Sequence, residues 1–245
     1  MDDDGDADHG ERAVHLLGTE RWPAIADAYT MGAYGHLAGY EGFGRDMTAE
    51  RSSVGDGLRH LFLAGVAARL AGDDARARNR ALQGVLVATD HRERVAGVDA
   101  AACDEWVGHL RTLAGNAEKA SDAYDRAAAG YESADPDDPA GATTRPLLQA
   151  GTDLLTQLSR PEDAAWDDIH GDGSTALARR VRFARARLGE YVAARVEAGH
   201  LHAPRGSTEY GNGSYECPEC GSNDINHVAG TVLCLRCDAR TERVS

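Results

Sequence analysis

The sequence predicts a large all-α domain followed by a small, cysteine-bearing β domain. Apolar residues recur at helical spacing across most of residues 19–199, as packed amphipathic helices require. Four of the five cysteines lie near the C-terminus in two Cys-x-x-Cys pairs, with short β-like stretches between them. A chain of 245 residues with 42% hydrophobic content is long enough for one large core and a small second one.

The charge and the hydropathy pattern exclude several classes of protein. A formal net charge of −14 opposes nonspecific attraction to nucleic acid or to an anionic membrane. No stretch approaches the length of apolar residues that a membrane span needs. Residues 1–6 are acidic where a secretory signal would be basic. We therefore expect a cytoplasmic protein with no membrane partner.

Lysine is almost missing from the chain, since Lys119 is the only one among 26 basic residues. Together with abundant Asp, Glu, Ala and Gly, this composition resembles that of proteins from halophilic archaea. A high-GC bacterial source, whose coding bias also favours arginine, is the alternative. The halophile hypothesis implies a working environment of molar salt, in which the Debye length is about 3 Å and surface charges interact weakly.

The first part of the chain is expected to be irregular on either side of one helix. Residues 1–18 are acidic and weakly patterned, which predicts a flexible N-terminus. Thr19 is a candidate cap for a helix that has Pro23 in its first turn and continues to about Gly39. Residues 40–56 are Gly-rich and polar, which favours a loop.

Two helical pairs follow, and their sequences resemble each other. The first pair breaks at Gly72 and the second at Gly115, each in a Leu-Ala-Gly tripeptide. The matching positions, at a constant offset of 43, are Gly65 with Gly108, Leu70-Ala71-Gly72 with Leu113-Ala114-Gly115, and Ala77 with Ala120. The isolated Cys103 lies within the second pair and is expected to be a small buried residue.

The second pair carries a recognisable pattern of small and aromatic residues. Gly108, Gly115, Ala120, Tyr124 and Ala127 fall at the spacings of the tetratricopeptide consensus, so this region resembles tetratricopeptide repeats. The offset of 43 departs from the repeat length of about 34, and an alanine stands where the first pair should have its tyrosine. The resemblance implies antiparallel helix pairs that cross at small residues and present a concave face to a protein partner.

Two further helices are expected, at about 144–159 and 174–198, with Ser174 as the cap and Gly199 as the stop of the second. Residues 200–214 have linker composition, which places the domain boundary there and the β domain at 215–245. The second helix carries the one basic run of the chain, Arg179, Arg180, Arg182, Arg185 and Arg187. The Arg179–Arg187 helix either contacts nucleic acid or pairs with acidic neighbours, and its arginines are expected to scatter around the polar arc of the helix rather than to form a narrow stripe.

Cys217, Cys220, Cys234 and Cys237 are the candidate metal ligands. Each Cys-x-x-Cys turn brings two thiolates to one point, and two such turns complete the tetrahedral sulfur set that zinc prefers. A segment of this size buries too little apolar surface to fold unaided, and metal ligation supplies roughly 10–16 kcal/mol in comparable peptides. We predict one structural Zn²⁺. A rubredoxin-type iron centre and two disulfide-type redox pairs are the alternatives.

The local sequence around these cysteines predicts a zinc ribbon. Gly221 and Asp238 follow the two pairs, where the backbone needs a positive φ, and residues 225–228 and 231–235 have the pattern of two short strands. The Cys-Pro-Glu-Cys-Gly-Ser opening and the Gly-Thr-Val-Leu-Cys-x-x-Cys return resemble the N-terminal zinc ribbon of transcription factor IIB over about 25 residues. The preceding residues do not resemble the cyclin folds that follow the ribbon in that factor. His227 is a neighbour of the centre and not a ligand, because four thiolates saturate the ion.

No catalytic constellation stands out in the sequence. Asp163, Asp167, Asp168 and His170 form either a carboxylate site or, more simply, a charged helix cap. His200 and His202 lie in the expected linker, either as ligands or exposed to solvent. Four further histidines stand alone in helical patterns: His36, His60, His91 and His109.

These observations favour a non-enzymatic, zinc-binding adaptor or scaffold with a protein partner that the sequence does not identify. One alternative is a transcription- or nucleic-acid-associated regulator that uses the ribbon and the Arg179–Arg187 helix. Another is an enzyme whose site forms from residues distant in sequence.

Overall fold

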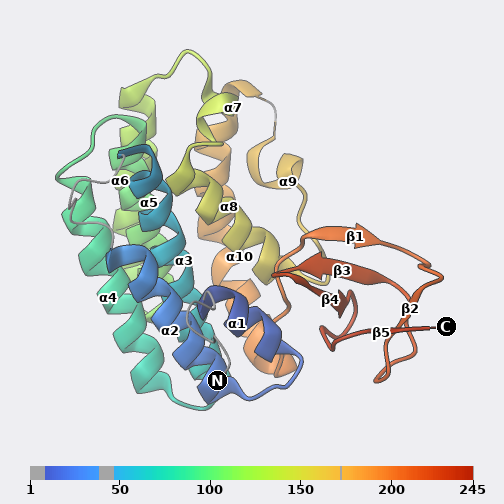
Figure 1. The fold of residues 1–245 in the computed structure, drawn as a ribbon. Coiled ribbons are helices and arrows are strands. Elements are labelled where there is room, and N and C mark those ends of the chain that lie inside the picture. The colour runs from blue at the N-terminus through green and yellow to red at the C-terminus, as the bar shows by residue number, and fades with distance from the viewer. Residues whose placement is uncertain (1–8, 39–46, 172, 245) are drawn as a thin grey trace.

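The computed structural model describes residues 9–38, 47–171 and 173–244, and it shows a helical body with a small β region at one side (Figure 1). The helices are α1 (His9–Leu17), α2 (Trp22–Ala38), α3 (Met47–Leu70), α4 (Asp74–Arg92), α5 (Val98–Leu113), α6 (Ala117–Ala134), α7 (Pro139–Ala142), α8 (Pro146–Ser159), α9 (Trp166–His170) and α10 (Ala176–Ala198), with a 3₁₀ turn at Gly173–Thr175. The strands are β1 (Ser207–Glu209), β2 (Tyr215–Glu216), β3 (Ile225–Val228), β4 (Thr231–Cys234) and β5 (Glu242–Arg243). The prediction of a mostly helical chain with a small C-terminal β region is confirmed.

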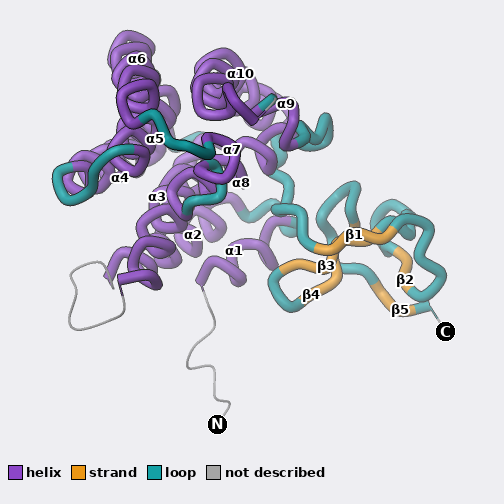
Figure 2. The backbone as a smooth tube through the Cα atoms, turned by 90° about the horizontal axis from the view of Figure 1, so that it is seen from above, coloured by secondary structure: helices purple, strands orange, loops and turns teal. Residues whose placement is uncertain are grey.

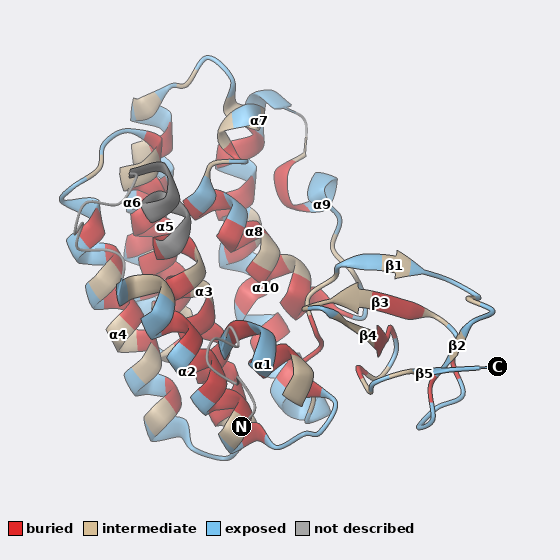
Figure 3. Ribbon diagram, viewed as in Figure 1, coloured by how far each residue is buried: buried red, intermediate tan, exposed pale blue. Residues whose placement is uncertain are grey.

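The first six helices pack against one another in chain order. Each helix from α2 to α5 lies against the next one, and α1 lies against α2. Helices α8 and α10 then return across this layer, α8 onto α3 and α5, and α10 onto α5, α6 and α8 (Figure 2). The apolar residues on the facing sides of these helices form one continuous core, seen as the buried inner surfaces in Figure 3. No described helix has both the length and the apolarity that crossing a membrane would require.

The two predicted helical pairs, α3–α4 and α5–α6, are present and turn at the predicted glycines. Gly72 and Gly115 have φ values of 77° and 75°, the left-handed conformation that ends a helix and that glycine adopts at least cost. The next residue caps the following helix in both pairs: Asp73 accepts from the Arg76 amide at 2.9 Å, and Asn116 accepts from the Lys119 amide at 3.2 Å. The offset of 43 in the sequence is therefore an offset between equivalent positions of two helical hairpins.

Small residues allow the helices of each pair to approach closely. A Cβ atom placed on Gly108 would lie 2.7 Å from ring carbons of Tyr124, and one on Gly65 would lie 3.3 Å from the Ala77 carbonyl oxygen of α4. Tyr124 is buried over Gly108 and fills the space that a larger residue would take. The predicted role of these glycines at helix crossings is confirmed.

The prediction of a flexible segment over residues 1–18 is wrong for residues 9–17, which form helix α1, while residues 1–8 lie outside the described residues. Ala13, Val14 and Leu17 are buried against the rest of the body, so this short helix is stabilised by packing rather than by its own propensity. The expected loop over 40–56 is likewise wrong from residue 47, where α3 begins, and residues 39–46 are not described. Gly55, on α3, faces the backbone of Pro146 at a distance that no larger residue could occupy.

The expected linker over residues 200–214 is also wrong. Leu201 and Ala203 are fully buried, and β1 pairs antiparallel with β3 so that the first sheet has the order β1-β3-β4. The side chain of Asn226 fixes this segment, because it accepts from the Gly206 amide at 2.8 Å and donates to the Pro204 carbonyl at 3.0 Å. A second sheet, β2-β5, closes the β region. The polar composition of residues 200–214 predicted a linker, but hydrogen bonds to distant residues hold this segment in place.

Candidate metal centre

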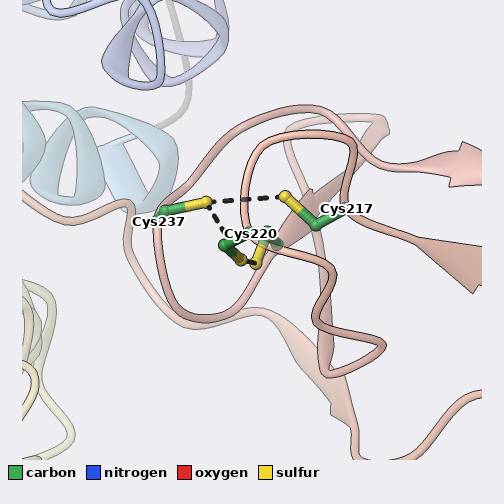
Figure 4. Close-up of side chains that lie close together, drawn as sticks. Cys217, Cys220 and Cys237 are labelled. Carbon is green, nitrogen blue, oxygen red and sulfur yellow. Dashed lines mark hydrogen bonds between the residues drawn. The ribbon is translucent and has the colours of Figure 1, made fainter.

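The four cysteines predicted as ligands converge on one point. The Sγ atoms of Cys217 and Cys237 are 3.5 Å apart, those of Cys220 and Cys234 are 3.5 Å apart, and those of Cys220 and Cys237 are 3.6 Å apart. Figure 4 shows the side chains of Cys217, Cys220 and Cys237 pointing toward one another from two turns. Cys217 and Cys234 are buried, and Cys220 lies at the surface.

The spacing of the sulfur atoms fits a single metal ion. A tetrahedral centre with metal–sulfur bonds of about 2.3 Å places its sulfur atoms about 3.8 Å apart. The observed separations are slightly shorter than this value and far longer than the S–S bond of about 2.05 Å in a disulfide. The four thiols could therefore hold one metal ion, and all four cysteines are free rather than joined in the disulfides of the redox alternative.

Two equivalent backbone turns produce this convergence. The Gly221 amide donates to the Cys217 carbonyl at 2.9 Å, and the Asp238 amide donates to the Cys234 carbonyl at 3.0 Å. Gly221 and Asp238 have φ values of 67° and 57°, so both residues adopt the positive φ predicted for them. Strands β3 and β4 pair Ile225 with Cys234 and place the second turn at the end of the hairpin.

The electrostatics of the cluster favour a bound cation. Burial and the neighbouring thiols Cys217 and Cys220 raise the pKa of Cys237 far above its ordinary value, and burial also raises the pKa of Cys234. Burial alone would raise the pKa of Cys220 as well, but the Ser222 backbone and the adjacent thiols lower it. Four adjacent thiols ionise together only when a positive charge compensates them, and a divalent metal supplies that charge.

Asp238 has a second role that its backbone conformation does not reveal. Its fully buried carboxylate accepts hydrogen bonds from His200 Nε2 at 3.0 Å and from His202 Nδ1 at 2.8 Å. Arg160, at the C-terminal end of α8, places Nη1 3.4 Å from the other carboxylate oxygen. Although burial by itself would raise the pKa of Asp238, these three partners lower it to about 2, so the carboxylate is ionised.

Arg160 connects the metal-binding turn to the helical body. It is almost completely buried, and its guanidinium donates to the Ala203 carbonyl at 2.5 Å and to the Leu235 carbonyl at 2.6 Å. A second contact joins α1 to the β region, where Nε2 of His15 lies 2.6 Å from the Ala229 carbonyl oxygen. We use the term junction for the contacts of Arg160, His200, His202 and Asp238. The junction joins the β region to the C-terminal end of α8 and to the segment that follows α10.

The histidines of the expected linker were not identified from the sequence as junction residues. His202 is buried and His200 half-buried, so the expectation of solvent exposure is wrong for both. Their ring nitrogens and the Asp238 carboxylate lie within 4.8 Å of one another, as metal ligands would. The hydrogen bonds to Asp238 and the neighbouring Arg160 charge account for this grouping without an ion. One feature of the sequence pointed to this role: Asp238 follows the second Cys-x-x-Cys pair at the position that a glycine, Gly221, occupies after the first.

The acidic cluster before the last helix does not form a carboxylate site. Asp163 pairs with Arg205, and Asp168 accepts from the Ala165 amide at 2.8 Å, which caps α9 as the simpler interpretation predicted. His170 is buried, and its Nε2 lies 3.2 Å from Nη1 of Arg180. Burial and the Arg180 charge lower the pKa of His170 to about 4.

The Arg179–Arg187 helix does not present its arginines as a set. Arg180 is 1% exposed and donates to both carboxylate oxygens of Glu105 at 3.0 Å, deep in the core. Arg185 pairs with Asp125 at 2.6 Å, and Arg187 pairs with Glu190 at 2.6 Å. The expected scatter around the polar arc of the helix is wrong for Arg180, which lies on the apolar stripe with Leu177, Val181 and Ala184.

Glu105 and Arg180 form the centre of a buried polar network. Tyr131 donates its hydroxyl to Glu105 at 2.7 Å, and His109 lies between Glu105 and the Tyr124 hydroxyl, 3.0 Å from the latter. Burial alone would raise the pKa of Glu105, but Arg180 and His109 hold it well below its usual range. His109, which stood alone in the sequence pattern, is thus a structural member of this network. Cys103 is buried as predicted, and burial raises its pKa to about 12.

Comparisons with protein-family models, with curated proteins and with solved structures found no match to this chain. The geometry of the cysteine cluster and of the junction therefore carries the functional argument.

Proposed function

We propose that the chain is a non-enzymatic adaptor in which Cys217, Cys220, Cys234 and Cys237 bind one structural zinc ion. The observation that carries this proposal is the convergence of four thiols, because four protein ligands leave a tetrahedral zinc ion no open position for a substrate or a reactive water. The second group of candidate ligands among the described residues, His200, His202 and Asp238 of the junction, is engaged in its own hydrogen bonds. The metal therefore shapes the β region as a zinc ribbon and takes no part in a reaction.

The helical part of the proposal is a tetratricopeptide-like array. Support comes from the two hairpins at an offset of 43, from their left-handed glycines and from the contact of Gly108 with Tyr124. In an array open on its concave side, a partner occupies the inner face. Here α10 packs on α5 and α6 with Leu177, Val181 and Ala184 buried, so the chain covers much of this inner face itself.

A protein partner then has to bind the outer surface, where α2 and α4 expose apolar side chains. Met31, Tyr34 and Leu86 are 47%, 42% and 71% exposed. The Tyr34 hydroxyl donates to the Gln83 side chain at 3.3 Å, so side chains bridge α2 and α4 at this patch. Interface cores are enriched in tyrosine and methionine and depleted of charge. We use the term α2–α4 patch for these three residues.

The proposal retains a cytoplasmic protein from a halophilic organism. The nucleic-acid alternative is weakened because Arg180 lies in the core and Arg185 and Arg187 pair with carboxylates. Only Arg179 and Arg182 of the run remain as exposed candidates for phosphate contact.

Affinity capture from the source cells at molar salt, read by mass spectrometry, tests the adaptor proposal. We expect one protein in stoichiometric amount with the wild type, and its loss with the double variant Tyr34→Ala/Leu86→Asp. Val196→Asp is the matched control, because Val196 is also an exposed apolar helix residue but lies on α10. Retention of the same protein by the double variant would overturn the proposed surface. Recovery of nucleic acid that is lost with Arg179→Glu/Arg182→Glu would favour the regulator instead.

A further inference from the structure

A cavity of about 260 Å³ lies where the helical body meets the β region. Helices α1, α2, α3 and α8 form its walls, and the turn between β3 and β4 closes one side with Val228 and Ala229. The cavity is distinct from the cysteine cluster, since none of the four cysteines lines it. Its volume is large enough for several water molecules or for one small organic molecule.

Buried polar atoms without hydrogen-bond partners line this cavity. They include the Tyr29 hydroxyl, Arg59 Nε and Gln157 Oε1. Tyr29 and Gln157 are each 1% exposed. Each such group costs about 1–3 kcal/mol when it is left without a partner, so three of them in one cavity indicate a polar occupant.

None of these three atoms makes a hydrogen bond to another described residue. The Gln157 amide nitrogen already donates to the His202 carbonyl at 2.8 Å, which turns its oxygen toward the cavity. Arg59 Nη1 approaches Asp153 at 3.5 Å, which leaves Nε unpaired. Burial raises the pKa of Tyr29 to about 12 and outweighs the opposing effects of Gln157 and Arg59, so the hydroxyl keeps its proton. The cavity thus offers the donors of Tyr29 and Arg59, the acceptor of Gln157 and, in addition, the unpaired Nδ1 of His60, which donates or accepts according to its tautomer.

The charges around the cavity limit the chemistry of the occupant. Arg59 provides one positive charge, while Asp56 and Glu11 provide two carboxylates that form no ion pair with a described residue. Burial and the Arg59 charge lower the pKa of His60 to about 3, so this imidazole is neutral at physiological pH. A simple anion would meet a lining of net negative charge, and a simple cation would leave Arg59 Nε and the Tyr29 hydroxyl unpaired. A molecule with both kinds of group satisfies the lining.

We propose that this cavity binds a small zwitterion of amino-acid size, with one carboxylate and one amino group. The carboxylate accepts from Arg59 Nε and the Tyr29 hydroxyl, and the amino group donates to Gln157 Oε1 and the Asp56 carboxylate. The ring of His60 lies 5.5 Å from that of Tyr29 and 5.0 Å from that of His36, with the ring planes tilted to one another, and together the three rings form an aromatic side of the cavity against which a side chain can pack. Since the walls belong to both the helical body and the β region, an occupant also stabilises their contact.

Saturation-transfer NMR on the full, zinc-loaded chain tests this inference, with each of the common L-amino acids as a separate probe. We expect at least one to bind saturably with a Kd below about 1 mM. Two analogues of that amino acid, the amine without its carboxylate and the carboxylic acid without its amino group, are expected to bind at least tenfold more weakly. Saturable binding by none of the amino acids would overturn the inference and leave water as the occupant. Equal binding by the carboxylate alone would overturn it in favour of a simple anion site.

The variant Tyr29→Phe separates a ligand group from a structural one. It removes only a hydroxyl that has no partner, so the unliganded protein is expected to unfold at the same or a higher denaturant concentration while the probe binds at least tenfold more weakly. Arg59→Gln is expected to have the same effect on binding. Arg76→Gln, a surface arginine of α4 paired with Asp27, is the matched control and is expected to leave binding unchanged. Unchanged binding by both Tyr29→Phe and Arg59→Gln would overturn the assignment of this cavity.

Discussion

Oδ2 of Asp238 lies 2.8 Å from Nδ1 of His202, so the residue directly after the candidate metal ligand Cys237 is hydrogen-bonded to the segment that leaves the last helix. The φ of 57° at Asp238 belongs to the metal-binding turn, and the same conformation directs its carboxylate into the junction. Formation of the turn and docking of the β region are therefore coupled through one residue.

Asp238→Asn is expected to loosen the junction without removing the metal. Asparagine tolerates the positive φ, so the turn survives, but Arg160 loses its buried counter-charge. Removal of one partner of a buried pair costs about 3–5 kcal/mol. Hydrogen exchange should quicken in residues 200–206 while the metal content per chain stays constant. The control Asp224→Asn removes a carboxylate that pairs with an exposed arginine, Arg236, and should change exchange much less.

Removal of the metal is expected to unfold the β region and to spare most of the helical body. The purified chain should contain one zinc ion, measured by elemental analysis, and an iron centre would be recognised by its visible absorption. Chelation should abolish exchange protection in β3 and β4 while the far-ultraviolet helical signal largely remains. Cys237→Ser should lower the metal content, and Cys103→Ala, at the isolated buried cysteine, should leave it unchanged. Full exchange protection in β3 and β4 after exhaustive chelation would contradict the structural role of the metal.

Arg180→Met is expected to destabilise the helical body by about 3–5 kcal/mol, because it leaves Glu105 charged and buried. The double variant Glu105→Leu/Arg180→Met should regain more than half of this loss, since no unpaired charge remains. Urea unfolding of the two single variants and the double variant measures this coupling. Arg185→Met breaks an exposed pair with Asp125 and should cost at most about 1 kcal/mol. Equal effects of Arg180→Met and Arg185→Met would refute the importance of the buried network.

Gly108→Ala is expected to destabilise the α5–α6 pair by about 1–3 kcal/mol. The added methyl group would lie 2.7 Å from the Tyr124 ring, which is itself buried and cannot move freely. Gly35→Ala is a matched control within a helix, because nothing lies within 4 Å of the position of its Cβ. That change should be neutral or stabilise the protein by up to about 1 kcal/mol. Thermal or urea unfolding of both variants gives the comparison.

The stability of the protein is expected to decrease as the pH falls below about 6.5. Burial, followed by the charge of Arg59, lowers the pKa of His60 to about 3, so between these two values the unfolded chain binds a proton that the folded chain does not. Each such proton reduces the free energy of unfolding by about 1.4 kcal/mol per pH unit. Urea unfolding between pH 4 and pH 6.5 measures this slope, and His60→Gln should reduce it by about one proton. An unchanged slope in this variant would contradict the assignment to His60.

The sequence was most informative where structure depends on neighbouring residues. Two Cys-x-x-Cys turns and the positive φ of Gly221 and Asp238 are local properties, and the structure confirms them. The helical pairs with turns at Gly72 and Gly115 follow from helical periodicity and from the conformational freedom of glycine.

The features that the sequence did not reveal depend on contacts between distant segments. Burial of Leu201, β1 pairing and the bonds to Asp238 all join residues that lie far apart in the chain. The burial of Arg180 could have been predicted from its spacing, because it lies three residues after Leu177 and four before Ala184, on the apolar side of its helix. The network with Glu105 explains why a charge is tolerated there.

The contact of His15 with the Ala229 carbonyl closes a loop of 214 residues. The helical hairpins join segments that are adjacent in the chain, so their formation costs little loop entropy, whereas this contact must wait until the body between its ends is compact. We therefore expect the boundary between the helices and the β region to assemble last during folding. By the same reasoning it is where the native protein opens first, well before the helices themselves unfold.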